Sequence, residues 1–459
     1  MAKVKKALYI ILISYLIYLV LFGIVPFARY HPKTVTQNTS PQWIETSNRV
    51  SLIDDINESW QVRVDIIEAA ETSIDVAYYA FDKGDSVPTF LAHLYNAAEN
   101  GVKVRLLVDG LTHGLSDESS VLEAFMTHEN IEVAFYHRPN LLLPLNWQDR
   151  MHDKIIIVDG ELALIGGRNI GDKYFTEENI RSVSIDRDIL IFKEDDSGGF
   201  QEIPGYFEEL WSYEKMHYLE NKAGRALSRK ASSGRELLLE IYRDYQDNYG
   251  ERHPIDWYAR SFPMNRAYYI HNSLEYPYKQ PIVWKNMLEL IEQAEESVLI
   301  QSPYVVPANK QIQEWQEAIP PGVETSLITN GIESSNNPFA YPGYLNHRDD
   351  LLDADNFNLY EYADDNSQLH SKLFIIDERI TVIGTFNLDQ RSANLSTESM
   401  MVIDSEDFAQ HVLENIDSRY GENIYLVTHE NKYESEASLF KHFYMNLMRP
   451  IAWLLQGLL

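Results

Sequence analysis

Two copies of one short motif bring the same chemically active residue types to matching places in the chain. The copies span residues 152–159 and 370–377, and both have the form H-x-K-x-x-x-x-D. They are separated by 218 residues, from 152 to 370. One histidine beside a lysine is common in packed strands, whereas repetition at one spacing points to a shared chemical task. The candidate catalytic residues are therefore His152, Lys154, Asp159, His370, Lys372 and Asp377.

An asparagine stands 17 residues after each motif histidine, at Asn169 and Asn387. Paired His, Lys and Asn side chains suit cleavage of a phosphodiester, because the phosphate repels nucleophiles until positive charge and amide donors neutralise its oxygens. One neutral imidazole attacks phosphorus while a second, protonated imidazole gives its proton to the leaving alkoxide. Both forms exist near neutral pH because the ordinary pKa of histidine is about 6.5. The asparagines are candidate substrate-binding residues.

Each motif needs a rigid element to position it. The apolar runs at 155–158 and 373–376 predict short buried strands, in which a His and a Lys two residues apart share one face. A second apolar run follows each turn and ends in small residues, so each half predicts a β-hairpin that presents His, Lys and Asn. Asp159 and Asp377 have the opposite parity and stand where each strand stops, which indicates a structural or supporting role within the motif.

The chain around the motifs is also duplicated. Helical and strand patterns alternate in each half, which is typical of parallel pairing and an α/β sandwich. Residues 322–331 repeat the pattern of residues 101–110 at an offset of 221, close to the offset of the motifs. Two similar lobes can place both motifs across a pseudo-twofold axis, and we therefore expect one active site formed within one chain. The sequence of the first lobe predicts helices at 62–70 and 88–100 and strands at 73–80 and 102–108.

The chain resembles the phospholipase D superfamily, and within it the bacterial cardiolipin synthase-like branch, from about residue 50 onward. Three features carry the resemblance: the paired motifs, the stretches Ile165-Gly-Gly-Arg-Asn-Ile-Gly171 and Gly384-Thr-Phe-Asn-Leu-Asp-Gln-Arg-Ser392, and Glu398. The implied fold is a pair of phospholipase D-like α/β sandwich lobes with pseudo-twofold symmetry. The implied mechanism uses a phosphohistidine, usually on the first motif histidine, His152, with His370 as the acid and later the base.

The resemblance also implies roles for the remaining site residues. Lysines and asparagines would hold the phosphoryl oxygens, and an acidic residue downstream of each motif would orient a histidine. The residues at those places are Lys154, Lys372, Asn169, Asn387, Asp186 and Glu398. Asp188 is the less favoured candidate for the first acidic position. Ser396 stands where the family usually has an asparagine, two residues before the final glutamate.

No cofactor or metal is expected. Neither H-E-x-x-H nor a phosphate loop G-x-x-x-x-G-K-[ST] occurs in the sequence. Paired His and Lys chemistry needs no metal, so the sequence predicts activity that survives chelation. The chain has no cysteines, which excludes disulfides and thiolate metal sites.

The composition of the chain limits the kinds of molecule that it is expected to bind. A formal net charge of −30 argues against nucleic acid, whose binding depends on Lys and Arg at phosphates. The expected partners are a phospholipid, with phosphatidylglycerol favoured, and the membrane bilayer. With 459 residues, 45% of them hydrophobic, the chain is long enough for two sizeable cores.

Residues 7–28 carry no charge and are long enough to cross a bilayer as a helix. A cleaved signal peptide is the alternative, but the apolar run exceeds a typical signal core and residues 26–28 are not an A-x-A site. Three lysines precede the span (Lys3, Lys5 and Lys6), whereas Arg29 and Lys33 follow it. This bias predicts a single-pass anchor in the cell membrane with a cytoplasmic N-terminus and an extracytoplasmic catalytic domain.

The expected organisation is a transmembrane anchor at 1–28, a linker at 29–48, the first lobe at 49–215, an inter-lobe connector at 216–278, the second lobe at 279–430 and a C-terminal amphipathic tail at 431–459. The connector is the densest basic region, through Lys222, Arg225, Arg229, Lys230, Arg235 and Arg243. It is either a solvated helix face or a headgroup contact. The tail is either an interfacial segment or a helix packed on the domain.

Together these observations predict a membrane-anchored phosphatidyltransferase of cardiolipin synthase type, in which phosphatidylglycerol is the donor and a second lipid alcohol the acceptor. The alternative enzyme is a phospholipase D that passes the same intermediate to water and releases phosphatidic acid. A catalytically silent scaffold is disfavoured by intact His, Lys and Asn in both copies. Tyr79 and Tyr304, at strand ends, either line the site or belong to the core.

Overall fold

The structure is a computed structural model of the chain, and it describes residues 2–28, 33–36, 38–115, 119–140, 142–224, 228–249, 254–429, 435 and 437–459. Arg225 of the basic connector, residues 29–32 and 37 of the linker, and residues 431–434 and 436 of the tail lie outside the described residues.

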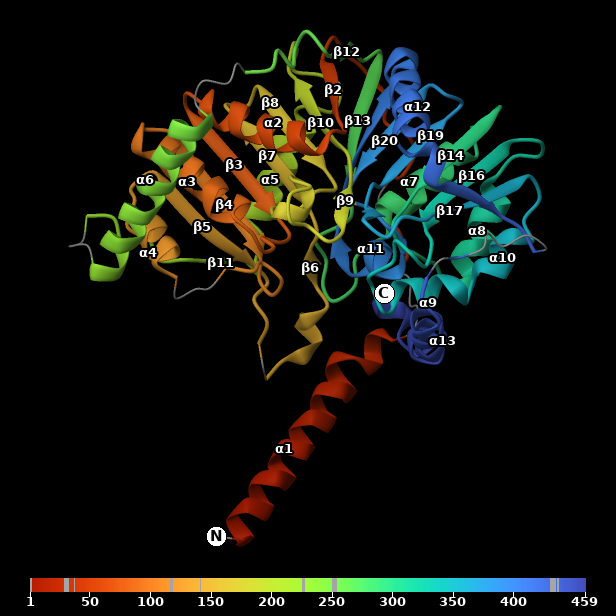
Figure 1. Cartoon of the computed structure of the whole chain (residues 1–459), viewed down its shortest axis with the longest axis horizontal. Coiled ribbons are helices and arrows are strands. Elements are labelled where there is room, and N and C mark those ends of the chain that lie inside the picture. Colours follow the sequence, from red (N-terminus) through yellow and green to blue (C-terminus); the bar gives the residue numbers. More distant parts are fainter. Residues whose placement is uncertain are drawn as a thin grey trace.

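The first lobe is built on a nine-stranded mixed sheet with the order β11-β5-β4-β3-β7-β8-β10-β2-β12 (Figure 1). Its parallel part is β3, β4 and β5, and the motif hairpin continues it in antiparallel pairing. The strands are β2 (Arg49–Ile53), β3 (Ser73–Tyr78), β4 (Lys103–Asp109), β5 (Ile131–Tyr136), β7 (Lys154–Val158), β8 (Leu162–Gly166), β10 (Asp188–Phe192), β11 (His217–Tyr218) and β12 (Phe262–Pro263).

The second lobe repeats this plan. Its nine-stranded sheet has the order β1-β13-β23-β20-β19-β14-β16-β17-β24. Taken from the other end, this order matches that of the first sheet strand for strand, with β19 in the place of β7. Again three strands pair in parallel and the motif hairpin extends them. The strands are β1 (Ile44–Glu45), β13 (Arg266–His271), β14 (Ser297–Gln301), β16 (Glu324–Asn330), β17 (Phe357–Tyr362), β19 (Leu373–Ile376), β20 (Ile380–Gly384), β23 (Ser399–Asp404) and β24 (Ile424–Val427). The predicted duplicated α/β fold is confirmed.

Helices cover the outer face of each sheet. The first sheet is covered by α2 (Ile56–Glu68), α3 (Ser86–Glu99), α4 (Ser120–Met126) and α6 (Arg229–Tyr249), and the second by α7 (Ile282–Ile291), α8 (Asn309–Ala318), α9 (Ala340–Leu345) and α10 (Arg348–Leu352). The helix predicted at 62–70 begins earlier, because the Asp55 side chain accepts hydrogen bonds from the backbone N–H groups of Asn57 and Glu58 and so caps α2.

The inner faces of the two sheets share one hydrophobic core. Ile155 and Ile157 of β7 lie in this core together with Leu373 and Ile375 of β19, while the alternate residues of each strand face the outer helices. α5 (Glu202–Trp211) and α12 (Glu406–Tyr420) complete the shared core. A strand buried on both faces explains why the sequence shows continuous apolar runs there.

Two short parallel pairings join the lobes directly. β6 (Arg150–Met151) pairs with β22 (Ser396–Thr397), and β9 (Val183–Ile185) pairs with β18 (Ser367–Leu369). In each case one strand comes from each lobe. These pairings align the two lobes beside the motif histidines, because His152 directly follows β6 and His370 directly follows β18.

The expected connector at 216–278 divides its elements between the lobes. β11, α6 and β12 associate with the first lobe, and β13 belongs to the second sheet. Two of the basic residues form ion pairs with the first lobe, Arg235 with Glu99 at 2.9 Å and Lys222 with Glu123 at 3.5 Å. α6 lies at the outer edge of the first lobe, on its far side from the second (Figure 1).

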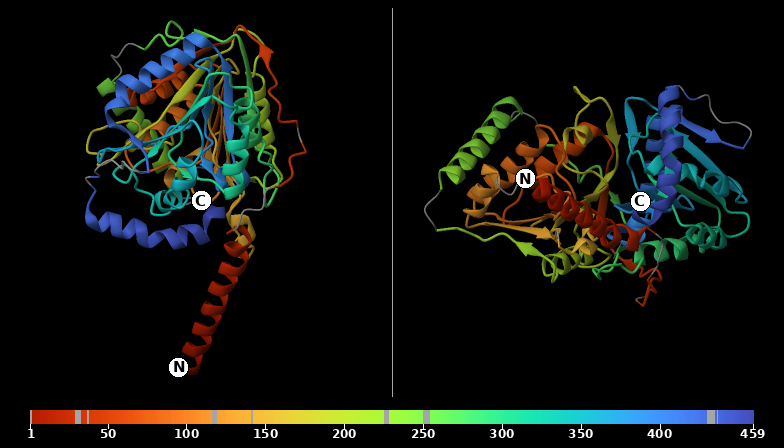
Figure 2. Two further views of the ribbon diagram at one scale, coloured as in Figure 1. Left: turned by 90° about the vertical axis from the view of Figure 1, so that its right-hand side faces the viewer. Right: turned by 90° about the horizontal axis from the view of Figure 1, so that it is seen from below.

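Two apolar helices lie at one end of the molecule. α1 (Ala2–Gly23) projects from the body, and the segment Val4–Phe27 is the one stretch among the described residues that is long and apolar enough to cross a membrane. α13 (Leu439–Leu454) lies across the same end of the body (Figures 1 and 2). It buries Met445 and Ala452 against the domain but exposes Leu439, Phe440, Phe443, Leu447, Ile451, Trp453 and Leu454.

Candidate active site

The aspartates of the two motifs lie at turns and do not line the cavity described below. Asp159 and Asp377 both have a left-handed backbone, with φ of +54° and +51°. The Asp159 carboxylate accepts hydrogen bonds from the backbone N–H groups of residues 71–73, and Asp377 does the same for residues 295–297. Each aspartate therefore holds the start of the strand that pairs with its motif strand, β3 or β14.

The motif histidines are placed by the pairings between the lobes. In the register of β6 with β22, Thr397 is opposite Met151, so the next residues, Glu398 and His152, come together. In the register of β9 with β18, Ile185 is opposite Leu369, and Asp186 and His370 follow.

Each histidine is thus oriented by a carboxylate from the other lobe. His152 Nδ1 lies 3.0 Å from both carboxylate oxygens of Glu398. His370 Nδ1 lies 2.5 Å from Asp186 Oδ2. A carboxylate at Nδ1 fixes the ring and leaves Nε2 available for chemistry. Asp188 serves a different purpose, because it forms buried ion pairs with Arg63 and Arg168.

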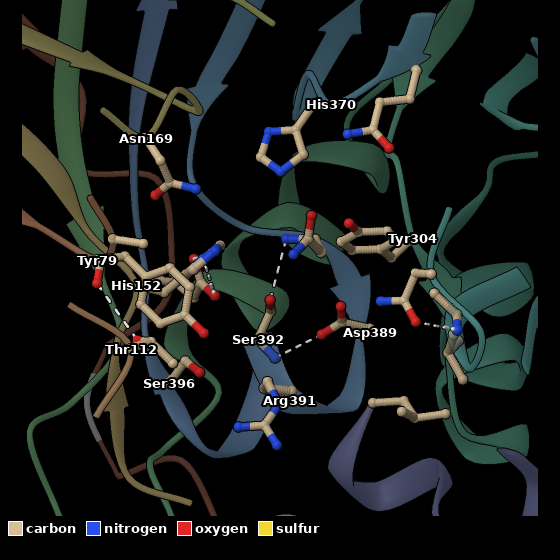
Figure 3. Close-up of a pocket in the computed structure, with 18 of the residues that line it drawn as sticks. Tyr79, Thr112, His152, Asn169, Tyr304, His370, Asp389, Arg391, Ser392 and Ser396 are labelled. Atoms are coloured by element: carbon tan, nitrogen blue, oxygen red, sulfur yellow. Dashed lines mark hydrogen bonds and ion pairs between the residues drawn. The ribbon is translucent and has the colours of Figure 1, made fainter. Parts of the chain in front are cut away.

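Both histidines open into one cavity of about 530 Å³, which both lobes line (Figure 3). A cavity of this size can hold a small molecule or one polar group of a larger one. The candidate residues His152, Asn169, His370, Asn387 and Glu398 all line it. Further lining residues are Tyr79, Thr112, Lys173, Tyr174, Tyr304, Asp389, Arg391, Ser392, Ser396, Leu458 and Leu459.

The two motif lysines are buried behind the histidines. Lys154 Nζ donates to the His152 carbonyl at 2.5 Å, and Lys372 Nζ donates to the His370 carbonyl. Burial, and next the charge of Lys372, lowers the pKa of Lys154 to about 7. Burial lowers the pKa of Lys372 to about 8. The charge of Lys372 repels that of Lys154, and together the two ammonium groups favour an anion in the cavity.

The two asparagines line the cavity from different lobes, and each has a buried amide oxygen without a hydrogen-bond partner. Asn169 Nδ2 donates to the Tyr174 hydroxyl, while Asn169 Oδ1 and Asn387 Oδ1 are buried without a hydrogen-bond partner. The oxygen and nitrogen ends of an amide exchange by rotation, so each asparagine can turn N–H donors toward an oxyanion. Because both asparagines line the cavity, a ligand there can supply the hydrogen bonds that their amides lack.

The two orienting carboxylates differ in charge. Although burial acts to raise it, the charge of Lys372 and the contact with His370 lower the pKa of Asp186 to about 2, so this carboxylate stays ionised. Burial raises the pKa of Glu398 to about 8. Burial and the two motif lysines hold the pKa of His152 well below its usual range, and burial lowers that of His370 to about 3. Both imidazoles are therefore neutral in the empty cavity.

Several residues at the cavity were not assigned to it from the sequence. Tyr79 and Tyr304 line it and contact the histidines, with ring centroids 4.8 Å from His152 and 6.3 Å from His370. Their place at strand ends was a signal that did not decide between site and core. Asp389 and Arg391 were visible within the stretch 384–392, but no spacing rule singled them out. Ser396 lines the cavity at the position where an asparagine was expected.

Comparison with known proteins gives consistent results. A family model described as "Cardiolipin synthase, PLD-like domain" matches residues 64–211 and 287–420. "Cardiolipin synthase C" of Escherichia coli is 27% identical over 395 residues, which cover 77% of this chain and 80% of that protein. "Cardiolipin synthase 2" of Staphylococcus epidermidis is 24% identical over 376 residues, 80% of this chain and 67% of that protein.

A solved structure has a similar two-lobed fold. The crystal structure of phosphatidylserine synthase from Haemophilus influenzae superposes with a TM-score of 0.64 and 13% sequence identity, covering 91% of this chain and 98% of that one. At this identity the likeness concerns the arrangement of the two lobes.

Proposed function

The chain belongs to the family of cardiolipin synthase PLD-like domains, and from this premise we propose that it transfers a phosphatidyl group from phosphatidylglycerol to a second lipid alcohol. One observation carries the proposal: each lobe supplies the acidic residue that orients the motif histidine of the other lobe. Two oriented imidazoles therefore line one cavity. The proposed alternative is hydrolysis by the same intermediate.

In the first half of the reaction, His152 Nε2 attacks the phosphorus of the donor lipid. The N–P bond forms as the P–O bond to the headgroup glycerol breaks, and His370 gives its proton to the departing oxygen. Two features favour these roles. Burial and the lysine charges keep His152 neutral, as a nucleophile must be, and the ionised Asp186 stabilises an imidazolium at His370 once an anionic substrate has raised its pKa.

In the second half, an alcohol replaces the glycerol. His370, now neutral, takes the proton of the incoming hydroxyl, its oxygen attacks phosphorus, and the bond to His152 breaks. In both steps Lys154 and Lys372 supply positive charge from behind the histidines, and the asparagine amides supply hydrogen bonds to the phosphoryl oxygens. With phosphatidylglycerol as the acceptor as well as the donor, two molecules of phosphatidylglycerol give one cardiolipin and one glycerol.

We further propose that α1 anchors the enzyme in the membrane, with the catalytic domain outside the cytoplasm. The exposed apolar face of α13 supports a second contact with the bilayer, because a helix that buries one face in the domain and exposes large apolar residues on another is typical of an interfacial helix. Proteolysis of intact protoplasts checks the orientation. Degradation of the lobes is expected, and their full protection would overturn it.

The test of the function is the product profile in phosphatidylglycerol vesicles with excess chelator. Wild type is expected to form cardiolipin and glycerol, and His152→Ala and His370→Ala are each expected to lose both products. Phosphatidic acid as the main product would establish the hydrolase instead. A strict requirement for an added divalent metal, or activity in either alanine variant, would contradict the mechanism.

A further inference from the structure

One cation at the cavity has no role in the chemistry described so far. Arg391 lines the cavity and follows Asn387 on the stretch that leads into α11 (Gln390–Asn394). Its Nε donates to the Leu458 carbonyl at 2.8 Å and its Nη2 to Gln148 Oε1 at 2.9 Å. Both acceptors are neutral. Among the residues that the structure describes, Nη1 has no hydrogen-bond partner and the guanidinium forms no ion pair.

Three carboxylates lie near Arg391, but none of them forms an ion pair with the guanidinium among the described residues. Asp389 and Asp109 favour its charged form from a distance, and the carboxylate of Leu459 accepts a hydrogen bond from its backbone N–H. Asp389 Oδ1 accepts the backbone N–H of Ser392 and so caps α11, and burial raises the pKa of Asp389 to about 6. Asp109 accepts from Arg150 at 3.1 Å and from the backbone of Met151. A largely buried guanidinium that is fixed by two neutral groups and forms no direct ion pair with a described residue can bind an anion from outside the protein.

The position of Arg391 points to an anion that enters from the membrane. Gln148, which holds the guanidinium, also donates from Nε2 to the carbonyl of Gly23 at 3.0 Å, and Gly23 ends α1. One side chain therefore connects the cation to the end of the apolar helix. Leu458, the other acceptor, lines the same side of the cavity. In Figure 3, Arg391 lies on the opposite side of the cavity from His370.

We propose that Arg391 binds the phosphate of the acceptor lipid. The phosphate under attack is already served by two lysines and two asparagines, so a separate cation at the membrane side suits a second phosphate. In phosphatidylglycerol, three carbons of the headgroup separate the attacking hydroxyl from such a phosphate. The inference rests on the proposed transfer and names the acceptor class: a lipid alcohol whose own headgroup carries a phosphodiester, in contrast to water or free glycerol.

The test separates the two halves of the reaction in full-length protein reconstituted in phosphatidylglycerol vesicles. Exchange of labelled glycerol into phosphatidylglycerol reports the first half and its reversal, and needs no second phosphate. Cardiolipin formation needs a second phosphate, that of the acceptor lipid. In Arg391→Gln, the ratio of cardiolipin formation to glycerol exchange is expected to fall about tenfold or more, as for loss of one charge-assisted hydrogen bond. Arg391→Lys should recover part of it.

Lys173→Gln is the matched control, because Lys173 also lines the cavity but pairs with Asp82 at 2.9 Å. Its ratio is expected to change less than about twofold, as for a surface ion pair. An equal fall in both variants, or an unchanged ratio in Arg391→Gln, would overturn the acceptor subsite. Absence of both exchange and cardiolipin in wild type would instead refute the proposed transferase, so the two failures are distinguishable.

Discussion

The motif aspartate Asp159 supports the fold, and its replacement should lower stability with little effect on chemistry. In the structure its carboxylate accepts four hydrogen bonds, from the backbone N–H groups of Glu71, Thr72 and Ser73 at 2.7 to 2.8 Å and from the Thr72 hydroxyl at 2.6 Å. None of these groups lines the cavity. Asp159→Ala therefore removes the tie between the motif turn and the start of β3.

The size of the loss follows from these contacts. Four hydrogen bonds at a partly exposed site contribute about 0.5 kcal/mol each, the lower end of the usual range. Alanine in the left-handed conformation of residue 159 costs about 1 kcal/mol more. The expected loss is about 3 kcal/mol, or a fall in Tm of about 3 °C for a chain of 459 residues whose two lobes share a core and unfold together. Asp159→Asn keeps the left-handed preference and one acceptor oxygen, and should lose about half as much.

The loss should also depend on pH. Although partial burial acts to raise it, the hydrogen bonds from Thr72 and the backbone hold the pKa of Asp159 below its ordinary value. A carboxylate whose folded-state pKa is lowered stabilises the fold fully above its ordinary pKa of about 3.9, and this stability is lost as pH falls through the lowered value. The difference in Tm between wild type and Asp159→Ala should therefore be full at neutral pH and shrink in acid.

Thermal unfolding in detergent, with turnover per folded molecule measured alongside, checks this prediction. Glu161→Ala in the same turn is the control, because Glu161 makes one exposed ion pair with Lys193 at 3.3 Å and should change stability by less than about 1 kcal/mol. If Asp159→Ala keeps the wild-type Tm but loses turnover more than about a hundredfold, the size of a general acid–base contribution, then Asp159 acts in the chemistry and the structural reasoning is wrong.

Two further predictions concern the site itself. Asp186→Asn and Glu398→Gln should each lower kcat by about a hundredfold or more without changing Tm in proportion, because each replaces the carboxyl group that orients a histidine through Nδ1 with an amide that can turn its N–H group toward that nitrogen. Unchanged kcat in both variants would contradict the pairing of each histidine with an acidic residue of the other lobe. The value of kcat/KM should fall as pH rises above about 7, because burial and Lys372 lower the pKa of Lys154 to about 7 and the ammonium charge is then lost. A flat profile from about pH 6 to 9 would refute this, and Lys154→Arg, which stays charged, should shift the fall to higher pH.

Local patterns were enough to predict the duplicated architecture. Apolar runs of four residues around the motifs became β7 and β19, and their second runs became β8 and β20, because a strand buried on both faces requires continuous apolar sequence. The near-equal offsets of the repeats reflect two sheets with the same strand order. These features are local and repeat at short range, which is why periodicity finds them.

The crossed arrangement at the histidines depends on contacts that periodicity does not encode. β6, β9, β18 and β22 are two or three residues long, and each pairs with a strand from the other lobe. The family resemblance indicated that Asp186 and Glu398 would orient histidines, but only the register between the lobes assigns each to its partner. The sequence did not single out Arg391 for the same reason, because its partners Leu458 and Gln148 lie 67 and 243 residues away along the chain.

The most direct test of the central claim is detection of the covalent intermediate. Wild-type protein mixed with phosphatidylglycerol and quenched in base, where phosphohistidine survives, should carry one phosphatidyl group on the peptide that contains His152. His152→Ala should carry none. No adduct on any histidine during turnover, or an adduct on His370 alone, would contradict the assignment of the nucleophile and with it the account of how the two lobes share one reaction.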